Sequence, residues 1–416
     1  MPRAVCIVSP GSLASDPRVV KEARALHDAG YEVTTVTCDY SEALRAEDDE
    51  IAATAPWKVV RVRRAPEEGV SARVASTIAK ALETAGMTVP AGVAACSARA
   101  PVGPLMRTLR GVRAELYIAH YVAALPAAAG AARRHGALLG FDAEDFHSGE
   151  GTKDPGEDFR MRMVEAVEGA FLPDCAYMTA ASPMIGAAYT QRYGLASTTV
   201  LNVFPLAMAP ERPRQRQGQG LKAYWFSQTI GLDRGLQAFI QAMGHARTPI
   251  TLDIRGSNRW GHGDALLAVA GQVGAEGRVR LLPMAPPGEM VRLAAEYDIG
   301  LSLETDVSEN RRICLTNKIF TYLLAGIPVV MSRTPAQVKL APDLGMAARL
   351  CSLDDPAELA SILDSLASPG ARAAAAAEAW RLGRERYNWE KEQAELLTAV
   401  AAAFDRSMPA AGKAGH

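Results

Sequence analysis

Short apolar segments alternate with longer stretches of helical periodicity along the whole chain. Each segment is nearly continuous in apolar residues and partly β-branched, which is typical of strands buried on both faces of a parallel sheet. The first half contains AVCIVS, EVTTVTC, WKVVRVR, AELYIAH, ALLGFDA, AYMTAAS and TTVLNVF, and the second half contains KAYWFSQ, ITLDIRG, RVRLLP, DIGLSLE, IPVVMS and AARLCS. This alternation predicts βαβ units, and therefore an α/β protein with doubly wound parallel sheets.

A segment without periodicity separates the two sets of strands. Residues 205–220 hold three prolines and two glycines, a composition that is typical of a linker. The long helical end of the chain is rich in Ala and Glu, and the final residues lack an apolar pattern. We therefore predict a Rossmann-like domain over residues 1–205, a linker over 206–220, a second Rossmann-like domain over 221–385, a C-terminal helix over 386–406 and a disordered tail over 407–416.

Composition narrows the class of protein. The chain has 416 residues and a net charge of -1, so it is long enough for two or three domains and has no overall charge that favours nucleic acid. No apolar run reaches the roughly 18 residues that span a bilayer, and the first apolar run resembles a strand and not a signal peptide. The six cysteines form no CxxC pair, which favours reduced thiols in the cytoplasm and argues against zinc.

The turn after the first strand is a candidate ligand loop. Asp16 and Pro17 suit the N-cap and the first position of the following helix. Before them lies a long turn of small residues that includes Gly11 and Ser12. Open α/β sheets bind ligands at the carboxyl ends of their strands, where this turn lies. The turn lacks the GxGxxG pattern, which argues against a nicotinamide site, and an ordinary surface loop is the alternative.

Two helix starts in the second half suggest a phosphate site. Arg234 and Gly235 precede one helix, and Thr316 can cap another that begins with Asn317 and Lys318. A cation in the first turn of a helix is unfavourable unless an anion binds there, because the helix N-terminus is itself positive. The pattern therefore indicates a clamp for a diphosphate, and a solvated lysine on an amphipathic helix is the alternative.

Three segments in this order resemble one known family. They are SDPRVVKEARALHDAGYEVTTVT, FSQTIGLDRGLQAFIQA and NKIFTYLLAGIPVV, and the last is the most specific of them. The chain resembles, over nearly its whole length, a bacterial glycosyltransferase of the GT-B fold close to the retaining family 4. The resemblance implies two Rossmann-like domains that face across a cleft, with the nucleotide sugar bound mainly by the second and the last helix packed on the first.

The resemblance also implies roles for individual residues. By position, Arg234 and Lys318 would hold the donor diphosphate, with Gly235 and Asn317 as further donor-binding residues, and the loop with Gly11 and Ser12 would approach the donor from the other domain. The chain departs from the commoner family pattern at three of its positions. Thr321 and Ile313 stand where that pattern has glutamates, and Gln228 stands where it often has a basic residue. Glu304 and Glu309 lie nearby in the sequence as candidate replacements for the glutamates.

Polar residues at two strand ends of the first half are candidate catalytic groups. His120 ends one strand, and Asp142, Glu144, Asp145 and His147 follow another. A carboxylate here could balance positive charge on the sugar ring, and Glu144 and Asp145 are the best candidates. A helix cap with loop salt bridges is the alternative, and for His120 a structural role is the alternative. No Asp-x-Asp sequence occurs, so we predict no metal.

The acceptor cannot be identified from the sequence. Residues 69–114 carry six cations and a single anion, Glu83. This stretch could lie on a membrane surface and reach a lipid-linked acceptor, cover a small-molecule acceptor, or form a solvated helical pair. We expect no cofactor, a UDP- or GDP-linked sugar as co-substrate, and a cytoplasmic location that includes the inner membrane surface.

The resulting hypothesis is a metal-independent glycosyltransferase that retains the anomeric configuration. The basic residues and helix N-termini would stabilise the leaving diphosphate. Two alternatives remain open at this point. One is a nucleotide-sugar epimerase of the same fold, and the other is a non-catalytic binder of sugar nucleotides.

Overall fold

The computed structural model describes residues 2–63, 68–98, 101–152, 155–213 and 220–407. It divides into two compact units: residues 1–200 with 393–416, and residues 201–392. Part of the predicted linker, 214–219, lies outside the described residues, as do 408–416 of the predicted tail. Each of the thirteen apolar runs contains an observed strand within the described residues.

Unit 1 is built on a parallel sheet in the order β3-β2-β1-β4-β5-β6-β7. Its strands are β1 (Ala4–Val8), β2 (Glu32–Asp39), β3 (Lys58–Arg63), β4 (Leu116–His120), β5 (Leu138–Ala143), β6 (Tyr177–Ala180) and β7 (Thr198–Thr199). Its helices are α1 (Pro17–Asp28), α2 (Arg45–Thr54), α3 (Glu68–Thr84), α4 (Ala91–Ser97), α5 (Val102–Leu109), α6 (Tyr121–His135), α7 (Pro155–Phe171) and α8 (Pro183–Tyr193). The predicted N-cap is confirmed, because Oδ1 of Asp16 accepts a hydrogen bond from the Val19 amide.

Unit 2 is built on a parallel sheet in the order β10-β9-β8-β11-β12-β13. Its strands are β8 (Leu221–Thr229), β9 (Ile250–Ser257), β10 (Val279–Leu282), β11 (Ile299–Ser302), β12 (Val329–Ser332) and β13 (Ala348–Cys351). Its helices are α9 (Leu236–His245), α10 (His262–Gln272), α11 (Met290–Ala294), α12 (Glu309–Ile313), α13 (Asn317–Ala325), α14 (Pro335–Leu344), α15 (Pro356–Ala367) and α16 (Pro369–Glu385). The prediction of doubly wound parallel sheets is therefore confirmed for both units.

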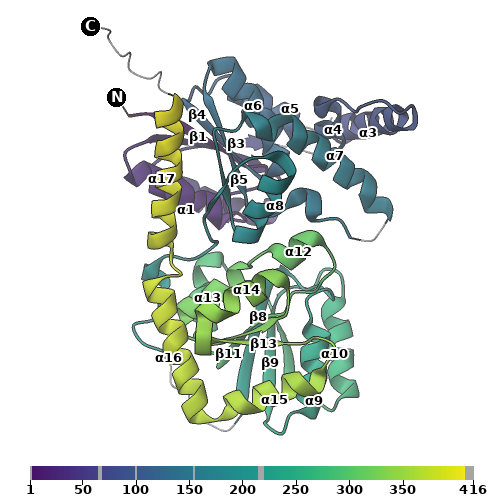
Figure 1. Cartoon of the computed structure of the whole chain (residues 1–416), viewed down its shortest axis with the longest axis vertical. Coiled ribbons are helices and arrows are strands. Elements are labelled where there is room, and N and C mark those ends of the chain that lie inside the picture. The colour runs from purple at the N-terminus through teal and green to yellow at the C-terminus, as the bar shows by residue number, and fades with distance from the viewer. Residues whose placement is uncertain (1, 64–67, 99–100, 153–154, 214–219, 408–416) are drawn as a thin grey trace. The chain divides into compact units, whose positions relative to one another are not determined.

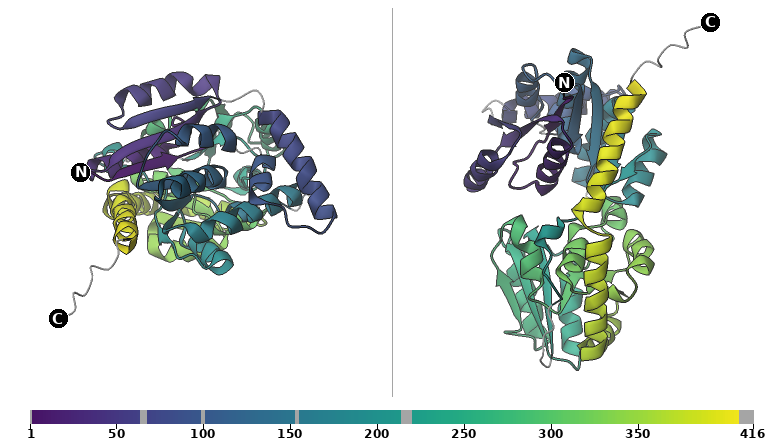
Figure 2. Two further views of the ribbon diagram at one scale, coloured as in Figure 1. Left: turned by 90° about the horizontal axis from the view of Figure 1, so that it is seen from above. Right: turned by 90° about the vertical axis from the view of Figure 1, so that its left-hand side faces the viewer.

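The last helix, α17 (Trp389–Ser407), packs on unit 1, although the residues that precede it in the chain belong to unit 2. The Phe404 ring stacks on Tyr31 with centroids 5.9 Å apart, and the Arg3 guanidinium lies over the Phe404 ring at 4.4 Å from its centroid. Arg406 also donates to the carbonyl of Ala176. Figures 1 and 2 show this helix beside the strands of unit 1.

Each sheet has one point where the strand order reverses. In unit 1 it lies between β1 and β4, and in unit 2 between β8 and β11. Helices leave the sheet in opposite directions on either side of such a point, so a crevice forms beyond the carboxyl ends of the two strands and commonly binds ligands. The loops after β8 and β11 are therefore the first place to look for a site in unit 2.

Close packing fixes helix α13 against β11. A Cβ on Gly300 would lie 2.2 Å from the ring of Tyr322, so only glycine lets α13 approach the strand this closely. The Tyr322 hydroxyl then donates to the carbonyl of Tyr224 in β8. All residues of α13 from Lys318 to Ala325 are buried. The N-terminus of this apolar helix is thereby held at the reversal point of the sheet.

Candidate functional site

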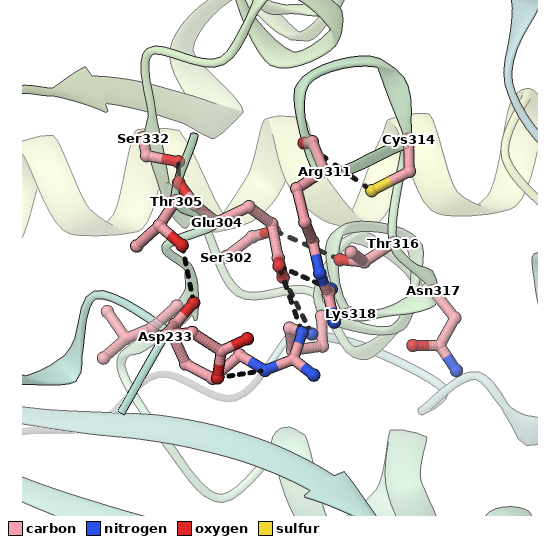
Figure 3. Close-up of polar contacts among 12 residues, drawn as sticks. Asp233, Ser302, Glu304, Thr305, Arg311, Cys314, Thr316, Asn317, Lys318 and Ser332 are labelled. Atoms are coloured by element: carbon pink, nitrogen blue, oxygen red, sulfur yellow. Dashed lines mark hydrogen bonds and ion pairs between the residues drawn. The ribbon is translucent and has the colours of Figure 1, made fainter. Parts of the chain in front are cut away.

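Three cations converge on one buried carboxylate in unit 2. Glu304, which follows β11, has a side chain that is only 1% exposed. Its oxygens lie 3.1 Å from Nζ of Lys318, 2.8 Å from a guanidinium nitrogen of Arg311 and 3.4 Å from one of Arg234. Figure 3 shows Lys318 and Arg311 pointing toward Glu304 from one side. We call these four residues the cation cluster.

The loops at the reversal point of the sheet bring the cluster together. Arg234 comes from the loop after β8, whereas Glu304 and Arg311 come from the segment after β11 and Lys318 from the first turn of α13. Ser308 caps α12 by accepting from the Arg311 amide, and the Ser332 hydroxyl donates to the Glu304 carbonyl at 2.6 Å. The cluster is therefore anchored by strand ends and caps and does not depend on a long free loop.

Gly235 gives the turn before α9 its shape. Its φ is +65°, and a Cβ there would lie 2.8 Å from both Cβ and the carbonyl oxygen of Leu303, the neighbour of Glu304. The left-handed conformation disfavours any residue with a Cβ, and the Leu303 backbone cannot give way without moving the cluster. Glycine is therefore required here for two independent reasons.

Replacing Gly235 with Ala is expected to lower the free energy of unfolding by about 3 kcal/mol, of which about 1 comes from the positive φ and about 2 from crowding. Gly274 is a matched control, because its φ of +66° is the same but nothing lies within 4 Å of its Cβ position. Gly274→Ala should cost only about 1 kcal/mol. Urea denaturation of both variants measures the difference, and equal losses would show that Leu303 does not crowd this position.

The charges of the cluster stabilise the ionised form of Glu304. Burial alone would raise the pKa of its carboxyl, but Lys318, Arg311 and Arg234 outweigh burial and hold the pKa at about 2. Burial, and then the two arginines, lower the pKa of Lys318, while Glu304 opposes this shift. The three cations meet the buried carboxylate of Glu304, and Nε of Arg234 also lies 3.5 Å from a carboxylate oxygen of Asp233, so the cations outnumber these two carboxylates by one. The side chains of Arg234 and Arg311 remain 19% and 24% exposed, so this charge is accessible.

The structure shows where the predicted donor residues lie. Arg234, Glu304 and Lys318 come together, and the Glu304 carboxylate lies beside Lys318. The diphosphate expected at this position stays a prediction. The Asn317 amide points away from Glu304 (Figure 3). Thr321 is fully buried, and its hydroxyl donates back to the Asn317 carbonyl at 2.9 Å, as is common inside helices. Gln228 lies exposed at the end of β8.

Arg311 is a cluster residue that the sequence reasoning did not single out. Its position seven residues before Lys318 has no counterpart in the motifs considered above. The signal available in the sequence was a pair of arginines, Arg311 and Arg312, between an apolar strand and an apolar helix. Arg312 instead pairs with Asp306 on the surface, so only the structure distinguishes the two.

A second buried polar network lies in unit 1. Arg18 in α1 forms two hydrogen bonds of 2.7 Å with Asp142 at the end of β5, and it also donates to the Val200 carbonyl. His120 is fully buried, with one ring nitrogen against Glu22 and the other 3.4 Å from Asp142. Burial opposes the charge on His120, but Glu22 and Asp142 raise its pKa to about 9. Such enclosure of His120 favours a structural role over contact with a substrate.

Glu144 lies just beyond this network and is partly exposed. It accepts a 2.5 Å hydrogen bond from the hydroxyl of Tyr121. Tyr121 has a φ of 61°, and it is the single non-glycine residue with positive φ in the described part of the chain. Backbone strain of this kind often accompanies functional sites. Burial and the nearby Asp16 raise the pKa of Glu144 to about 7, so its carboxyl is poised to change charge near neutrality. Asp145, also partly exposed, follows it directly.

The loop after β1 has an ordered backbone. The Gly11 amide donates to the Ser9 hydroxyl, and the Gly11 carbonyl accepts from the Cys38 amide in β2. The hydroxyls of Ser12 and Ser15 lie 3.3 Å apart. A Cβ on Gly11 would meet nothing closer than 3.6 Å, so packing inside unit 1 does not require glycine at this position.

The basic stretch 69–114 forms three helices and their connections. Helix α4 packs on both α3 and α7, as Figure 1 shows. Val70, Val74 and Ile78 lie exposed along α3, whereas Arg99 lies outside the described residues. None of the helices in the described ranges is long and apolar enough to cross a membrane. Within those ranges, no group of three or more His, Cys, Asp or Glu side chains could hold a metal ion.

Comparisons with known proteins agree with this architecture. The profile of a family described as "Glycosyl transferase-like" matches residues 233–398, which include the whole cation cluster. No curated protein matches the chain. HepE of Anabaena, solved with UDP and glucose, superposes with a TM-score of 0.69 at 15% identity and covers 96% of this chain and 100% of its own.

Two further solved structures are similar over almost their full length. Sucrose-phosphate synthase from Thermosynechococcus elongatus has a TM-score of 0.72 at 12% identity and covers 97% of this chain and 100% of its own. A TarM variant of S. aureus, solved with UDP, has a TM-score of 0.68 at 10% identity and covers 96% and 99%. Likeness at such low identity shows the fold. The chain therefore has the GT-B fold of two Rossmann-like domains, and residues 233–398 carry a glycosyl transferase-like domain.

Proposed function

We propose that this protein transfers a sugar from a nucleoside-diphosphate sugar to an acceptor, with retention of the anomeric configuration and without a metal. The cation cluster is the observation that carries this proposal. Its three cations lie at the reversal point of the unit 2 sheet, beside the N-terminus of α13, and neighbouring positive features of this kind fit a diphosphate. The resemblance to family 4 supports retention.

The cluster would act mainly on the leaving group. As the bond between the anomeric carbon and the phosphate oxygen breaks, its electron pair moves onto the diphosphate. Arg234, Arg311 and Lys318 stabilise that growing negative charge, which lowers the barrier because the charge is larger in the transition state than in the donor. The acceptor oxygen forms the new bond to the anomeric carbon, and its proton passes to the released diphosphate.

Glu304 keeps the three cations in place before the donor arrives. Without it, like charges would repel each other and turn outward, and the site would have to be assembled during binding. With Glu304 present, the cations are already close together in the folded protein, so donor binding does not have to bring them together. This is the general advantage of a preorganised site. This assigns Glu304 a positioning role beside the diphosphate, not a contact with the sugar.

Unit 1 would supply the carboxylate that balances charge on the sugar. Glu144 is the better candidate of the predicted pair because Tyr121 holds it and because its pKa of about 7 lets it ionise near neutral pH. Asp145 is the alternative carboxylate. His120 would act through Asp142 and α1, because both of its ring nitrogens face buried carboxylates.

Replacing Glu144 with Gln is expected to lower kcat about 100-fold while nucleotide affinity stays within about two-fold, because the charge acts on the transition state alone. Steady-state kinetics and calorimetry measure the two quantities. Glu165→Gln, an exposed change in α7, is the matched control. Equal kcat in the two variants would remove Glu144 from the mechanism.

The same variant has a signed effect on stability. The folded-state pKa of Glu144 is raised from 4.5 to about 7, so the folded protein holds this proton more tightly than the unfolded chain. Wild-type stability should therefore fall relative to Glu144→Gln as the pH rises from about 4.5 through about 7, and the gap should then stay constant. Thermal unfolding at several pH values measures this gap.

The proposal extends to the nucleotide and the acceptor. UDP or GDP is the proposed nucleotide, and the UDP complexes of HepE and TarM support UDP. The proposed acceptor is a small molecule or a lipid-linked glycan. For a lipid-linked acceptor, the exposed Val70, Val74 and Ile78 beside Arg73 and Lys80 would suit contact with a membrane surface.

Two other functions would give different products. An epimerase would convert the sugar nucleotide without an acceptor, and a non-catalytic binder would bind the nucleotide and release nothing. Thr321 is fully buried, and its hydroxyl is hydrogen-bonded within its own helix, so it cannot bind ribose as the glutamate of the commoner pattern does. This observation favours the non-catalytic binder as the second candidate function. Incubation with a sugar nucleotide, followed by analysis for free nucleoside diphosphate and for epimer, separates all three functions.

A further inference from the structure

The loop between β9 and α10 ends in an exposed tryptophan. Trp260 is 64% exposed, which makes it the most exposed large hydrophobic side chain in the described part of the chain. The guanidinium of Arg259 lies 5.0 Å from the centroid of its ring and so covers one face by a cation–π contact. Most of the ring area lies in water, where a flat group could stack on it.

The turn that carries Trp260 is rigid. The Gly261 amide donates to the Asn258 carbonyl, and the Asn258 side chain accepts from the Gly263 amide at 2.7 Å. Gly261 has a φ of +70°, as the end of this tight turn requires. Trp260 is therefore presented at a fixed place at the tip of the loop.

The same loop is fastened to the loop that leads to the cation cluster. Strand β9 pairs directly with β8, and the Ile230 amide donates to the Ser257 carbonyl at 3.0 Å. Nδ1 of His262 donates to the Ile230 carbonyl at 3.2 Å. The loop that carries Trp260 follows β9, the loop that carries Arg234 follows the adjacent strand β8, and Glu304 follows β11, the next strand. All three therefore lie at the same edge of the sheet, where adjacent strands are about 4.8 Å apart.

The other side of the cluster is closed by the protein itself. On the β12 side the Ser332 hydroxyl donates to the Glu304 carbonyl, and the buried side chain of Gln337 in α14 donates to Ser332. Helix α12 packs on α14 over this region. The protein itself therefore occupies the β12 side of Glu304, whereas β9, whose loop carries Trp260, lies on the opposite side in the strand order of the sheet.

We propose that Trp260, supported by Arg259, stacks on the nucleobase of the nucleotide whose diphosphate binds the cation cluster. This inference rests on the proposed function and adds a base-binding surface to it. Stacking on an aromatic ring accepts every base, so Trp260 would contribute affinity while the choice of base depends on other groups. The ligand class is a nucleoside diphosphate, free or linked to a sugar.

The test compares two ligands that share the phosphates but not the base. Calorimetry of Trp260→Ala with the nucleoside diphosphate that the wild-type protein binds should show about a ten-fold loss of affinity, or about 1.4 kcal/mol. Inorganic pyrophosphate should bind this variant and the wild-type protein equally. Trp260→Phe, which keeps a stacking ring, should recover most of the affinity for the nucleotide. Met346→Ala, another exposed apolar side chain of unit 2, is the control and should change neither ligand.

Three results would overturn this inference and leave the proposed function in place. One is nucleotide affinity in Trp260→Ala equal to that of the wild-type protein. Another is an equal loss for nucleotide and pyrophosphate, which would mean that the loop affects the cluster and not the base. The last is unchanged nucleotide affinity with a raised KM for the acceptor, which would assign the ring to the acceptor. Failure of the proposed function is distinct, because the wild-type protein itself would then bind no nucleotide.

Discussion

Replacing Lys318 with Ala is expected to weaken binding of the nucleoside diphosphate about 100-fold. A charged group that donates to phosphate in a buried setting contributes about 1.5–3 kcal/mol, and Lys318 combines this contact with the N-terminus of α13. The side chain is 7% exposed, so water replaces the lost ammonium poorly. Calorimetric titration of the variant with the nucleotide measures the loss directly.

The control for this change is Lys339→Ala, which removes an exposed lysine from α14 in the same unit. It should leave nucleotide affinity unchanged and shows how much a general loss of positive charge contributes. Because Lys318 also contacts Glu304, circular dichroism must show that Lys318→Ala is folded. A folded Lys318→Ala variant that binds the nucleotide as tightly as Lys339→Ala would contradict the proposed clamp.

Replacing Glu304 with Gln is expected to have opposite effects on stability and on anion binding. The folded-state pKa of Glu304 is lowered from 4.5 to about 2, so its ionised form contributes about 3 kcal/mol of stability above pH 4.5. This contribution is lost as the pH falls from about 4.5 through about 2. The variant should therefore be less stable by about this amount at pH 7, because three cations then face one another without a carboxylate.

The same variant should bind inorganic pyrophosphate more tightly than the wild-type protein, because the three cations no longer face the negative charge of Glu304. Added pyrophosphate should consequently restore more stability to Glu304→Gln than it adds to the wild-type protein. Thermal unfolding with and without pyrophosphate measures both effects. Weaker pyrophosphate binding in the variant would contradict this prediction and would mean that the loss of the positioning role of Glu304 outweighs the gain in positive charge.

The fold follows from local patterns in the sequence, whereas the site depends on contacts between distant residues. Alternation of apolar runs and helical stretches predicted all of the strands, because burial on both faces of a sheet leaves a periodic signal. The pairing of Glu304 with Arg234 spans 70 positions and leaves no such signal. The argument from helix polarity predicted a bound diphosphate beside Lys318, and it could not show that the protein itself places the Glu304 carboxylate there.

The same distinction applies to unit 1. The positions of His120, Glu144 and Asp145 at strand ends could be predicted, because strand ends follow from the apolar pattern. Their environments could not, since the buried partner of His120, Glu22, comes from a helix 98 residues away. The positive φ of Tyr121 is also absent from sequence propensity, because tyrosine disfavours that conformation.

The binding of nucleotides tests the central claim most directly. Thermal stabilisation is measured with UDP, GDP, ADP, CMP and dTDP side by side, for the wild-type protein and for Lys318→Ala. The account predicts that one nucleoside diphosphate adds about 2.7 kcal/mol of stability at 100 times its Kd, and that Lys318→Ala loses most of this gain at the same concentration. If none of the five stabilises the wild-type protein, the cation cluster is not a donor site and the proposed function is contradicted.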